Sequence, residues 1–301
     1  MLTHQAFAEA TLVPTYVDAA GVRRSGLMMK DGRTVRGSLL HRGGKLYVRG
    51  AHAAQVPAER ERLDRTVIYA GFMFDHYGHF LFDSLQRLWI CRERPDLPIA
   101  WTDGVPARGW QRDLLAMLGV DNEIVDLRGR PTLAREVILP EEGLRTAAFL
   151  REEHARFLGC VEPRPGDGPA WVWLSRSMLS AKKGRVAEDA ALERALAARG
   201  WLIYHPQEHP LRDQVAVLGA ARRIAGWSSS ALHTILLLRA FGGRVDVLAR
   251  GDHLGESFRM IARVKGLDQR EHELPLRHIK GEGAKAQWSV DVGEALAAID
   301  S

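Results

Sequence analysis

The chain has 301 residues, of which 46% are hydrophobic and 26% charged. This composition is ordinary for a soluble globular protein, and the length allows two domains, each with its own core. The net charge of +5 suits anionic partners such as nucleotide phosphates, membrane surfaces or acidic polymers, while the longest strongly apolar stretch, residues 231–241, is too short to span a bilayer.

Two further features indicate the cellular compartment that we expect for the protein. Cys91 and Cys160 lack the spacing of a metal site and are typical of buried thiols in a reducing compartment. The first ten residues, MLTHQAFAEA, lack the charged and apolar regions of a signal peptide. We therefore expect a soluble, cytoplasmic protein, whose basic surface permits peripheral contact with an anionic membrane. No basic stripe with interleaved aromatic residues is visible, so no nucleic-acid partner is expected.

Residues 1–62 are rich in Gly and Arg and contain short alternating runs. Turns at Asp31–Gly32 and Gly43–Gly44 separate segments that are typical of short strands. We interpret this region as a small β-rich appendage.

The stretch from Thr66 to Arg94 combines a strand pattern with a helix pattern. Residues 66–74 form a β-branched and aromatic run that predicts a buried strand. Asp75 is a candidate helix N-cap, after which the apolar period becomes helical. One side of this expected helix carries Leu81, Leu85, Leu88 and Trp89, and the other carries His76, His79, Asp83, Gln86 and Arg87.

The remaining sequence alternates strand and helix patterns, which predicts parallel sheets with right-handed crossovers. In the first half, strands are expected at 98–101, 123–127 and 136–139, and helices at 107–118 and 145–158. In the second half, strands are expected at 171–174, 201–204, 223–226 and 244–248, and helices at 187–199, 211–222, 229–239, 256–265 and 292–299. The Pro- and Gly-rich segment 161–170 is the expected linker. These patterns predict two α/β domains, over residues 63–164 and 165–301.

The polar face of the 76–88 segment is the first candidate site. His79 and Asp83 are four residues apart and can meet on one helical face. A histidine oriented by a carboxylate, or the carboxylate itself, would serve as a general base. An ordinary ion pair on a solvated face remains an alternative, and the spacing HxxHxxxD is also compatible with a metal site.

Two loops that follow expected strands are candidate anion sites. The first, residues 174–185, carries Arg176, Lys182 and Arg185, and guanidinium groups bind phosphate oxygens through paired hydrogen bonds. The second, Ser228, Ser229 and Ser230, is expected at a strand-to-helix turn, where hydroxyl and backbone N–H groups favour an anion. A solvated basic loop and a serine-rich helix cap without a ligand remain the alternatives.

Taken together, these stretches resemble the family 61 glycosyltransferases. The family has a His-Phe-Leu-x-Asp motif followed by Leu-x-Arg-Leu, which corresponds here to residues 79–83 and 85–88. It then has Ser-Arg, an Arg about ten residues later and an Asn-Glu pair, matched here by Ser175–Arg176, Arg185 and Ala187–Glu188.

Two later motifs complete the resemblance, which covers roughly residues 66–250. A Glu-Gln pair that opens a helix in the family corresponds to Asp213–Gln214. Where the family has a Gly-x-His-Gly-Ala turn, this chain has Gly-Trp-Ser-Ser-Ser at residues 226–230. The usual His and Gly of that turn are therefore absent.

The resemblance implies a fold of GT-B type, with two Rossmann-like domains facing a cleft, the acceptor on the first and the donor nucleotide on the second. It implies an inverting, metal-independent hexosyl or pentosyl transfer with no cofactor besides a nucleotide sugar, expected to be UDP-linked. The acceptor would be a saccharide or lipid-linked glycan in bacterial surface-polysaccharide (capsule) biosynthesis. The implied catalytic residues are Asp83, His79, Arg87 and His76, and the implied donor-binding residues are Arg176, Lys182, Arg185, Glu188, Gln214, Ser228, Ser229 and Ser230.

The roles expected of these residues follow from the implied reaction. Asp83 or His79 would act as the base, with Arg87 orienting Asp83. Glu188 would bind the donor ribose. The altered turn at 226–230 favours the alternative of a catalytically inactive scaffold that binds glycan or nucleotide, which product formation from a nucleotide sugar would exclude.

Overall fold

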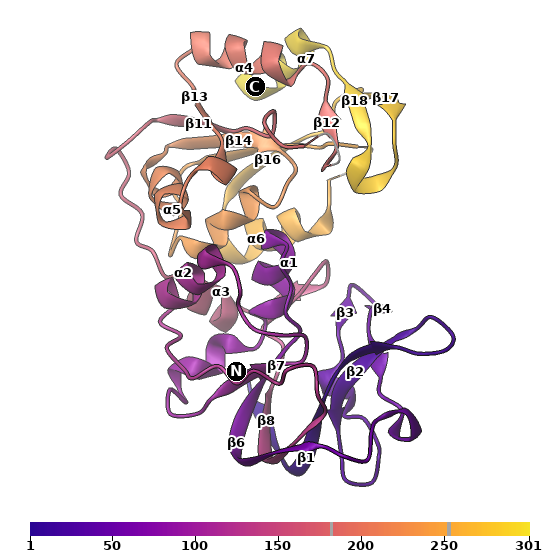
Figure 1. Cartoon of the computed structure of the whole chain (residues 1–301). Coiled ribbons are helices and arrows are strands. Elements are labelled where there is room, and N and C mark those ends of the chain that lie inside the picture. The colour runs from indigo at the N-terminus through magenta and orange to yellow at the C-terminus, as the bar shows by residue number, and fades with distance from the viewer. Residues whose placement is uncertain (181–182, 252–253) are drawn as a thin grey trace. The chain divides into compact units, whose positions relative to one another are not determined.

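The computed structural model describes residues 1–180, 183–251 and 254–301 (Figure 1). The chain divides into two compact units, unit 1 over Met1–Phe157 and unit 2 over Leu158–Ser301. Segment 161–170, which we expected to be a linker, belongs to unit 2: the N–H groups of Arg164 and Gly166 donate to backbone carbonyls of α5 at Gly219 and Ala220.

Unit 1 is built on a mixed six-stranded sheet with the order β5-β2-β1-β8-β6-β7. The strands are β1 (His4–Val17), β2 (Arg23–Met28), β5 (Arg49–Gly50), β6 (Glu61–Gly71), β7 (Ile99–Trp101) and β8 (Thr132–Pro140). Strand β1 is antiparallel to β2 and β8, whereas β6 is parallel to β7 and β8. The prediction of a separate β appendage is therefore wrong, because β1 pairs with β8 inside the main sheet.

The buried half of β1 explains why it joins this sheet. Its residues Ala10 and Leu12 are fully buried and pack in one cluster with Val67 and Tyr69 of β6 and Val137 of β8. Removing a side chain such as that of Leu12 from water contributes about 1.5–3 kcal/mol. The sequence of residues 1–62 gives no indication of this pairing, because the partner strand β8 follows more than a hundred residues later.

The helix predicted after Asp75 is broken into three short pieces. They are α1 (Tyr77–His79), the π-helix η3 (Phe80–Ser84) and the 3-10 helix η4 (Leu88–Arg92). The N–H of Leu85 bonds the carbonyl of Phe80, which closes the wide turn, and the carbonyl of Ser84 accepts from the Trp101 indole at 2.9 Å. Because a side chain takes that carbonyl, the regular ladder stops there. Single π turns of this kind occur frequently at functional sites.

The other small elements of unit 1 surround this segment. They are the hairpin β3 (His41–Arg42) and β4 (Lys45–Leu46), the hairpin β9 (Leu144–Arg145) and β10 (Phe149–Leu150), the helices α2 (Gly109–Met117) and α3 (Glu152–Leu158), and the 3-10 turns η1 (Arg36–Ser38) and η2 (Ala53–Gln55). The predicted helix over 145–158 is confirmed only in its second half, because residues 144–150 form a hairpin. The strand predicted at 123–127 is reduced to one bridge, between Ile124 and Ile99.

Unit 2 contains a five-stranded, fully parallel sheet with the order β13-β11-β14-β15-β16. The strands are β11 (Trp171–Leu174), β13 (Leu202–Tyr204), β14 (Arg223–Trp227), β15 (Arg244–Leu248) and β16 (Asp268–His272). The chain starts at β11, moves to one neighbour and returns to build on the other side. The sheet is thus doubly wound, with its switch point between β11 and β14, where ligands bind in such folds.

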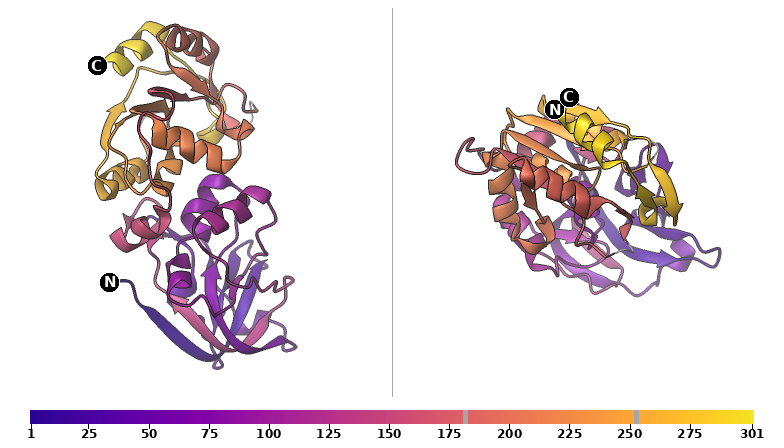
Figure 2. Two further views of the ribbon diagram at one scale, coloured as in Figure 1. Left: turned by 90° about the vertical axis from the view of Figure 1, so that its left-hand side faces the viewer. Right: turned by 90° about the horizontal axis from the view of Figure 1, so that it is seen from above.

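Helices cover both faces of this sheet. Helices α4 (Asp189–Ala198) and α7 (Val292–Asp300) lie side by side on one face (Figure 1, Figure 2). Helices α5 (Leu211–Ala220) and α6 (Glu256–Lys265) lie on the other face (Figure 1). The predicted helices at 187–199, 211–222, 256–265 and 292–299 and all four predicted strands of this half are confirmed.

Three parts of unit 2 differ from the sequence pattern. Strand β16 was not predicted. The helix predicted over 229–239 is a 3-10 helix, η7 (Leu232–Leu237), too short to provide much of a helix dipole. A small sheet that was not predicted joins β12 (Arg185–Val186), β18 (Gln287–Ser289) and β17 (Arg277–Lys280). The 3-10 turns η6 (Pro206–Glu208) and η8 (Gly283–Lys285) complete the elements described. In the described part of the chain, no helix has both the length and the apolar character needed to cross a bilayer.

Candidate active site

In unit 1, the carboxylate of Asp83 is the centre of a polar cluster. Its side chain is 1% exposed, and Arg42 donates to Oδ2 from Nη2 at 2.7 Å and from Nε at 3.1 Å. The hydroxyl of Thr146 donates to Oδ1 at 3.0 Å. The ring nitrogen Nδ1 of His79 lies 3.3 Å from Oδ2. We call these four residues, Arg42, His79, Asp83 and Thr146, the Asp83 cluster.

The geometry gives the two possible bases different environments. Both oxygens of Asp83 already have partners and the side chain is buried, so this carboxylate is suited to orienting a neighbour. His79 is 45% exposed in its side chain, and with Nδ1 turned to Asp83 its Nε2 is the nitrogen left for a ligand. A histidine held in this way by a carboxylate has the arrangement of a general base with its orienting group.

A row of rings borders the cluster. The rings of Phe74 and His79 have centroids 5.7 Å apart, and those of His76 and His79 are 5.1 Å apart. His76, a predicted catalytic residue, is exposed and precedes α1 as its N-cap. His76 therefore lies beside the exposed ring of His79, whereas Asp83 is buried.

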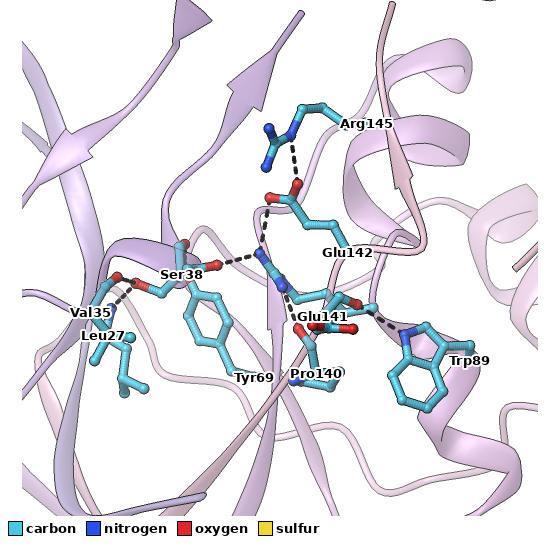
Figure 3. Close-up of polar contacts among 11 residues, drawn as sticks. Leu27, Val35, Ser38, Tyr69, Trp89, Pro140, Glu141, Glu142 and Arg145 are labelled. Atoms are coloured by element: carbon cyan, nitrogen blue, oxygen red, sulfur yellow. Dashed lines mark hydrogen bonds and ion pairs between the residues drawn. The ribbon is translucent and has the colours of Figure 1, made fainter. Parts of the chain in front are cut away.

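Arg87 does not orient Asp83, as we had expected. Its guanidinium is 1% exposed and donates to the carbonyls of Pro140 and Gly37 and to Glu142 Oε1 at 3.2 Å. Glu142 also accepts from Arg145 Nε at 2.8 Å (Figure 3). Burial lowers the pKa of Arg87, while the charge of Glu142 acts in the opposite direction. Arg87 thus joins β8 to the 36–38 turn, and the orienting role expected of it falls to Arg42.

In unit 2, two arginines converge at the switch point. Arg176 follows β11 and Arg250 follows β15, so both lie beyond the carboxyl ends of their strands. Arg176 Nη2 donates to the carbonyl of Lys183 at 3.0 Å, and Arg250 Nη1 donates to the same oxygen at 3.5 Å. This shared acceptor holds two like charges near each other.

Both guanidinium groups are poised to bind an anion. Burial, together with the charge of Arg250, lowers the pKa of Arg176 to about 10, and burial also lowers the pKa of Arg250. The Nε of each is buried and has no hydrogen-bond partner among the residues the structure describes. Two partly dehydrated cations with unused donors would gain strongly from a phosphate.

The serine turn lies against these arginines. Ser228 Oγ accepts from the backbone N–H of Arg250 at 3.0 Å, which joins the loops after β14 and β15. Ser229 is 9% exposed, and its Oγ is buried without a partner among the described residues. Ser230 is partly buried. Arg176, Arg250 and Ser228–Ser230 form what we call the switch-point site.

A buried acid adjoins the switch-point site. Asp189, the first residue of α4, is 5% exposed and accepts from the Trp227 indole at 2.7 Å. Burial raises its pKa to about 6, and the charge of Glu193 adds to this, while the indole of Trp227 and the charge of Arg176 oppose it. The switch-point site therefore adjoins a carboxyl group whose pKa is raised to about 6.

The other predicted donor residues are less well placed. Glu188 accepts from the hydroxyl of Ser289 at 2.8 Å and from the N–H of Val290 at 2.9 Å. Burial alone would raise its pKa, but these two donors outweigh burial and lower it. Its carboxylate thus holds β18, and each of its oxygens has a partner within the protein.

Three predicted residues remain. Gln214 Nε2 donates to the carbonyls of Pro206 and His209 at 2.8 and 2.9 Å, which fixes the loop before α5. Arg185 is exposed on β12. Lys182 lies outside the described residues.

Sequence reasoning missed three residues of these sites, Arg42, Thr146 and Arg250. Arg42 and Thr146 are 41 and 63 residues from Asp83 in sequence, and nothing local associates them with it. Arg250 had a usable signal, since it follows a predicted parallel strand just as Arg176 does. Within residues 1–180, 183–251 and 254–301, no group of three or more His, Cys, Asp or Glu side chains is arranged to hold a metal ion.

A doubly wound sheet with two guanidinium groups at its switch point, in a chain that also holds a His–Asp pair, is typical of an α/β enzyme acting on an anionic substrate. Residues 77–241, more than half of the chain, match the model of the family described as Glycosyltransferase 61, and the chain belongs to this family of glycosyltransferases. Membership implies a nucleotide-sugar donor and a glycan acceptor. No curated protein matches the chain.

Proposed function

We propose that this glycosyltransferase transfers a sugar by single displacement, with inversion, and that His79 is the base. The observation that carries this proposal is the 3.3 Å approach of His79 Nδ1 to the fully buried Asp83. Since Arg42 and Thr146 fix both oxygens of Asp83, the carboxylate in turn fixes the tautomer and direction of the imidazole.

In the proposed step the acceptor hydroxyl oxygen attacks the anomeric carbon of the donor sugar. The bond from that carbon to the nucleotide's phosphate oxygen breaks, and the phosphate oxygen leaves with the electron pair. The hydroxyl proton passes to His79 Nε2. A positioned base of this kind contributes roughly 10²- to 10⁴-fold to such a rate.

The donor phosphates would bind at the switch-point site. Arg176 and Arg250 offer two buried Nε donors, and Ser229 offers a buried hydroxyl. These groups would balance the charge that develops on the leaving phosphate, which is the task of electrostatic catalysis. We therefore propose a transfer that does not depend on a metal ion, with a nucleoside diphosphate, UDP in the first instance, as the leaving group.

We further propose that the two units act as the halves of a GT-B transferase, unit 1 serving the acceptor and unit 2 the donor. The division of chemistry supports this, since the base belongs to the first unit and the anion-binding groups belong to the second. We place the enzyme in bacterial surface-polysaccharide synthesis, on the cytoplasmic side of the membrane. The sequence resemblance to family members with that role supports this assignment.

The test combines nucleotide binding with transfer. Binding of UDP, GDP, CMP and NAD is measured by thermal shift with and without EDTA, and transfer is measured with the matching nucleotide sugars and a panel of saccharides. A ligand at 100 times its Kd should stabilise the protein by about 2.7 kcal/mol. We expect one nucleoside diphosphate to bind in EDTA and its sugar to be transferred with inversion. Absence of any nucleotide binding would contradict the proposal and favour an inactive scaffold.

Variants of His79 and Asp83 test the proposed base and the carboxylate that orients it. His79→Ala and Asp83→Asn are expected to lose roughly 10²-fold or more in kcat while they bind the nucleotide normally. Asp75→Asn is the matched control, because Asp75 lies in the same segment but is exposed and paired with Arg108. A folded His79→Ala protein with wild-type turnover would show that His79 is not the base.

A further inference from the structure

The β3–β4 hairpin brings an exposed aromatic ring next to the Asp83 cluster. The guanidinium carbon of Arg42 lies 4.1 Å from the centroid of the Tyr47 ring and 5.2 Å from that of Phe74. The same guanidinium donates to Asp83. Tyr47 is therefore separated from the carboxylate of the proposed base pair by one side chain.

Several contacts hold the hairpin in this position. The N–H of Gly43 donates to the carbonyl of Thr146 at 2.7 Å, and the N–H of Tyr47 donates to the carbonyl of Leu40 at 2.8 Å. Arg42 packs over the Tyr47 ring, which restricts the rotation of the tyrosine. The ring is nonetheless 44% exposed, so it is a fixed surface that is open to a ligand.

The surroundings of this ring favour a ligand that is both apolar and polar. Tyr47 follows the end of β4 in a bend, and the preceding Leu46 is 43% exposed. Two cationic residues, Arg42 and Lys45, pair across the hairpin. A single aromatic ring flanked by hydrogen-bond donors differs from the broad apolar surface of a protein or membrane contact.

A saccharide has the matching chemistry. One face of a sugar ring is made of C–H groups, which pack on an aromatic ring, whereas the hydroxyl groups around its edge accept hydrogen bonds from cationic side chains. Arg42 covers one face of the Tyr47 ring, so a sugar would pack on the other face, next to the Asp83 cluster.

We propose that the β3–β4 hairpin forms the acceptor subsite of unit 1, with Tyr47 as the platform for a saccharide ring. This inference rests on the proposed function, because it takes His79 as the group that accepts the hydroxyl proton. Residues 41–47 precede the segment 77–241 that matches the family. This chain's own N-terminal region thus supplies the subsite and, through Arg42, connects it to the base.

The test compares Tyr47→Ala and Tyr47→Phe with Leu46→Ala, a matched control on the same hairpin with almost equal exposure. In transfer assays Tyr47→Ala should raise the KM for the acceptor roughly tenfold, the size of one aromatic packing contact. Its KM for the nucleotide sugar should stay at the wild-type value. Tyr47→Phe and Leu46→Ala should both behave as the wild type. An unchanged acceptor KM for Tyr47→Ala, or an equal rise for Leu46→Ala, would overturn the subsite.

A binding measurement keeps the two proposals separable. Wild type and variants are applied, without donor, to an array of mono- and oligosaccharides, and to vesicles of anionic phospholipid. Saccharide binding that is lost in Tyr47→Ala supports the subsite even if no nucleotide sugar is used by the wild type. Tyr47-dependent binding to vesicles and not to any saccharide would assign this hairpin to a membrane surface and refute our inference.

Discussion

Replacing Asp189 by asparagine should change stability in a way that depends on pH. The carboxyl of Asp189 has its pKa raised from 3.8 to about 6 by burial. In the pH range between these two values the folded protein binds more protons than the unfolded chain, so stability falls as pH rises and stays low above 6. The charged carboxylate therefore costs about 3 kcal/mol at pH 8 and about half of that at pH 5.

Asparagine removes the buried charge, but part of the stability gained in this way is lost again. Its oxygen can still accept from the Trp227 indole, whereas its NH₂ group then faces the backbone N–H of Val186, which also donates to the carboxylate. That mismatch costs about 1 kcal/mol at every pH. We expect Asp189→Asn to stabilise the protein by about 2 kcal/mol at pH 8, and by about 1.5 kcal/mol less at pH 5.

The assay is urea unfolding followed by tryptophan fluorescence at both pH values. Asp167→Asn, an exposed carboxylate in unit 2, is the control and should show no such dependence. A change in the free energy of unfolding that is equal at pH 8 and pH 5, or larger at pH 5, would refute the reasoning. Because Asp189 adjoins Arg176 and Arg250, the same substitution should also tighten nucleotide binding above pH 6.

Three further predictions concern the framework of the two units. Asp246→Asn should destabilise the protein by about 3 kcal/mol or more, because it leaves the arginines that bond this fully buried carboxylate without their partner; urea unfolding at pH 7 measures this loss. Gly243→Ala should destabilise the protein by about 1–3 kcal/mol, since a Cβ there would overlap the carbonyl oxygen of Arg222; a lower Tm in thermal unfolding measures this loss. Gly242→Ala, with open space around it, is the control and should leave Tm nearly unchanged. Arg87→Met should lower the urea midpoint strongly, because it leaves the buried carbonyl of Pro140 and the buried carboxylate of Glu142 without this donor; a protein with wild-type stability would contradict its framework role.

Four of the five strands of the parallel sheet in unit 2 could be predicted from the sequence, because they are short, largely apolar runs separated by helices. The fifth, β16, was not predicted, since its polar sequence DQREH and its exposed or partly exposed side chains give no buried-strand pattern. The same alternation placed the loops at Arg176 and at Ser228–Ser230 after strands, although the order of strands that brings these loops together was not predicted. Only the doubly wound order of the sheet identifies the switch point.

The site in unit 1 could be predicted only in part. His79 and Asp83 are close in sequence and were recognised, but the groups that hold Asp83 come from distant hairpins. The prediction of one regular helix after Asp75 was wrong for a related reason. Residues 80–91 are buried on all sides, and a distant indole, that of Trp101, takes the carbonyl of Ser84, which no helical period can reveal.

The pairing of β1 with β8 has a consequence for how the protein is made. Residues 4–12 leave the ribosome long before their partners, residues 132–140. Until then β1 can pair only with β2 and leaves one edge open, and open edges of half-buried strands attract other chains. Unit 1 should thus fold late and slowly, as expected for contacts between distant residues, and its yield on expression should depend on chaperones more than that of unit 2.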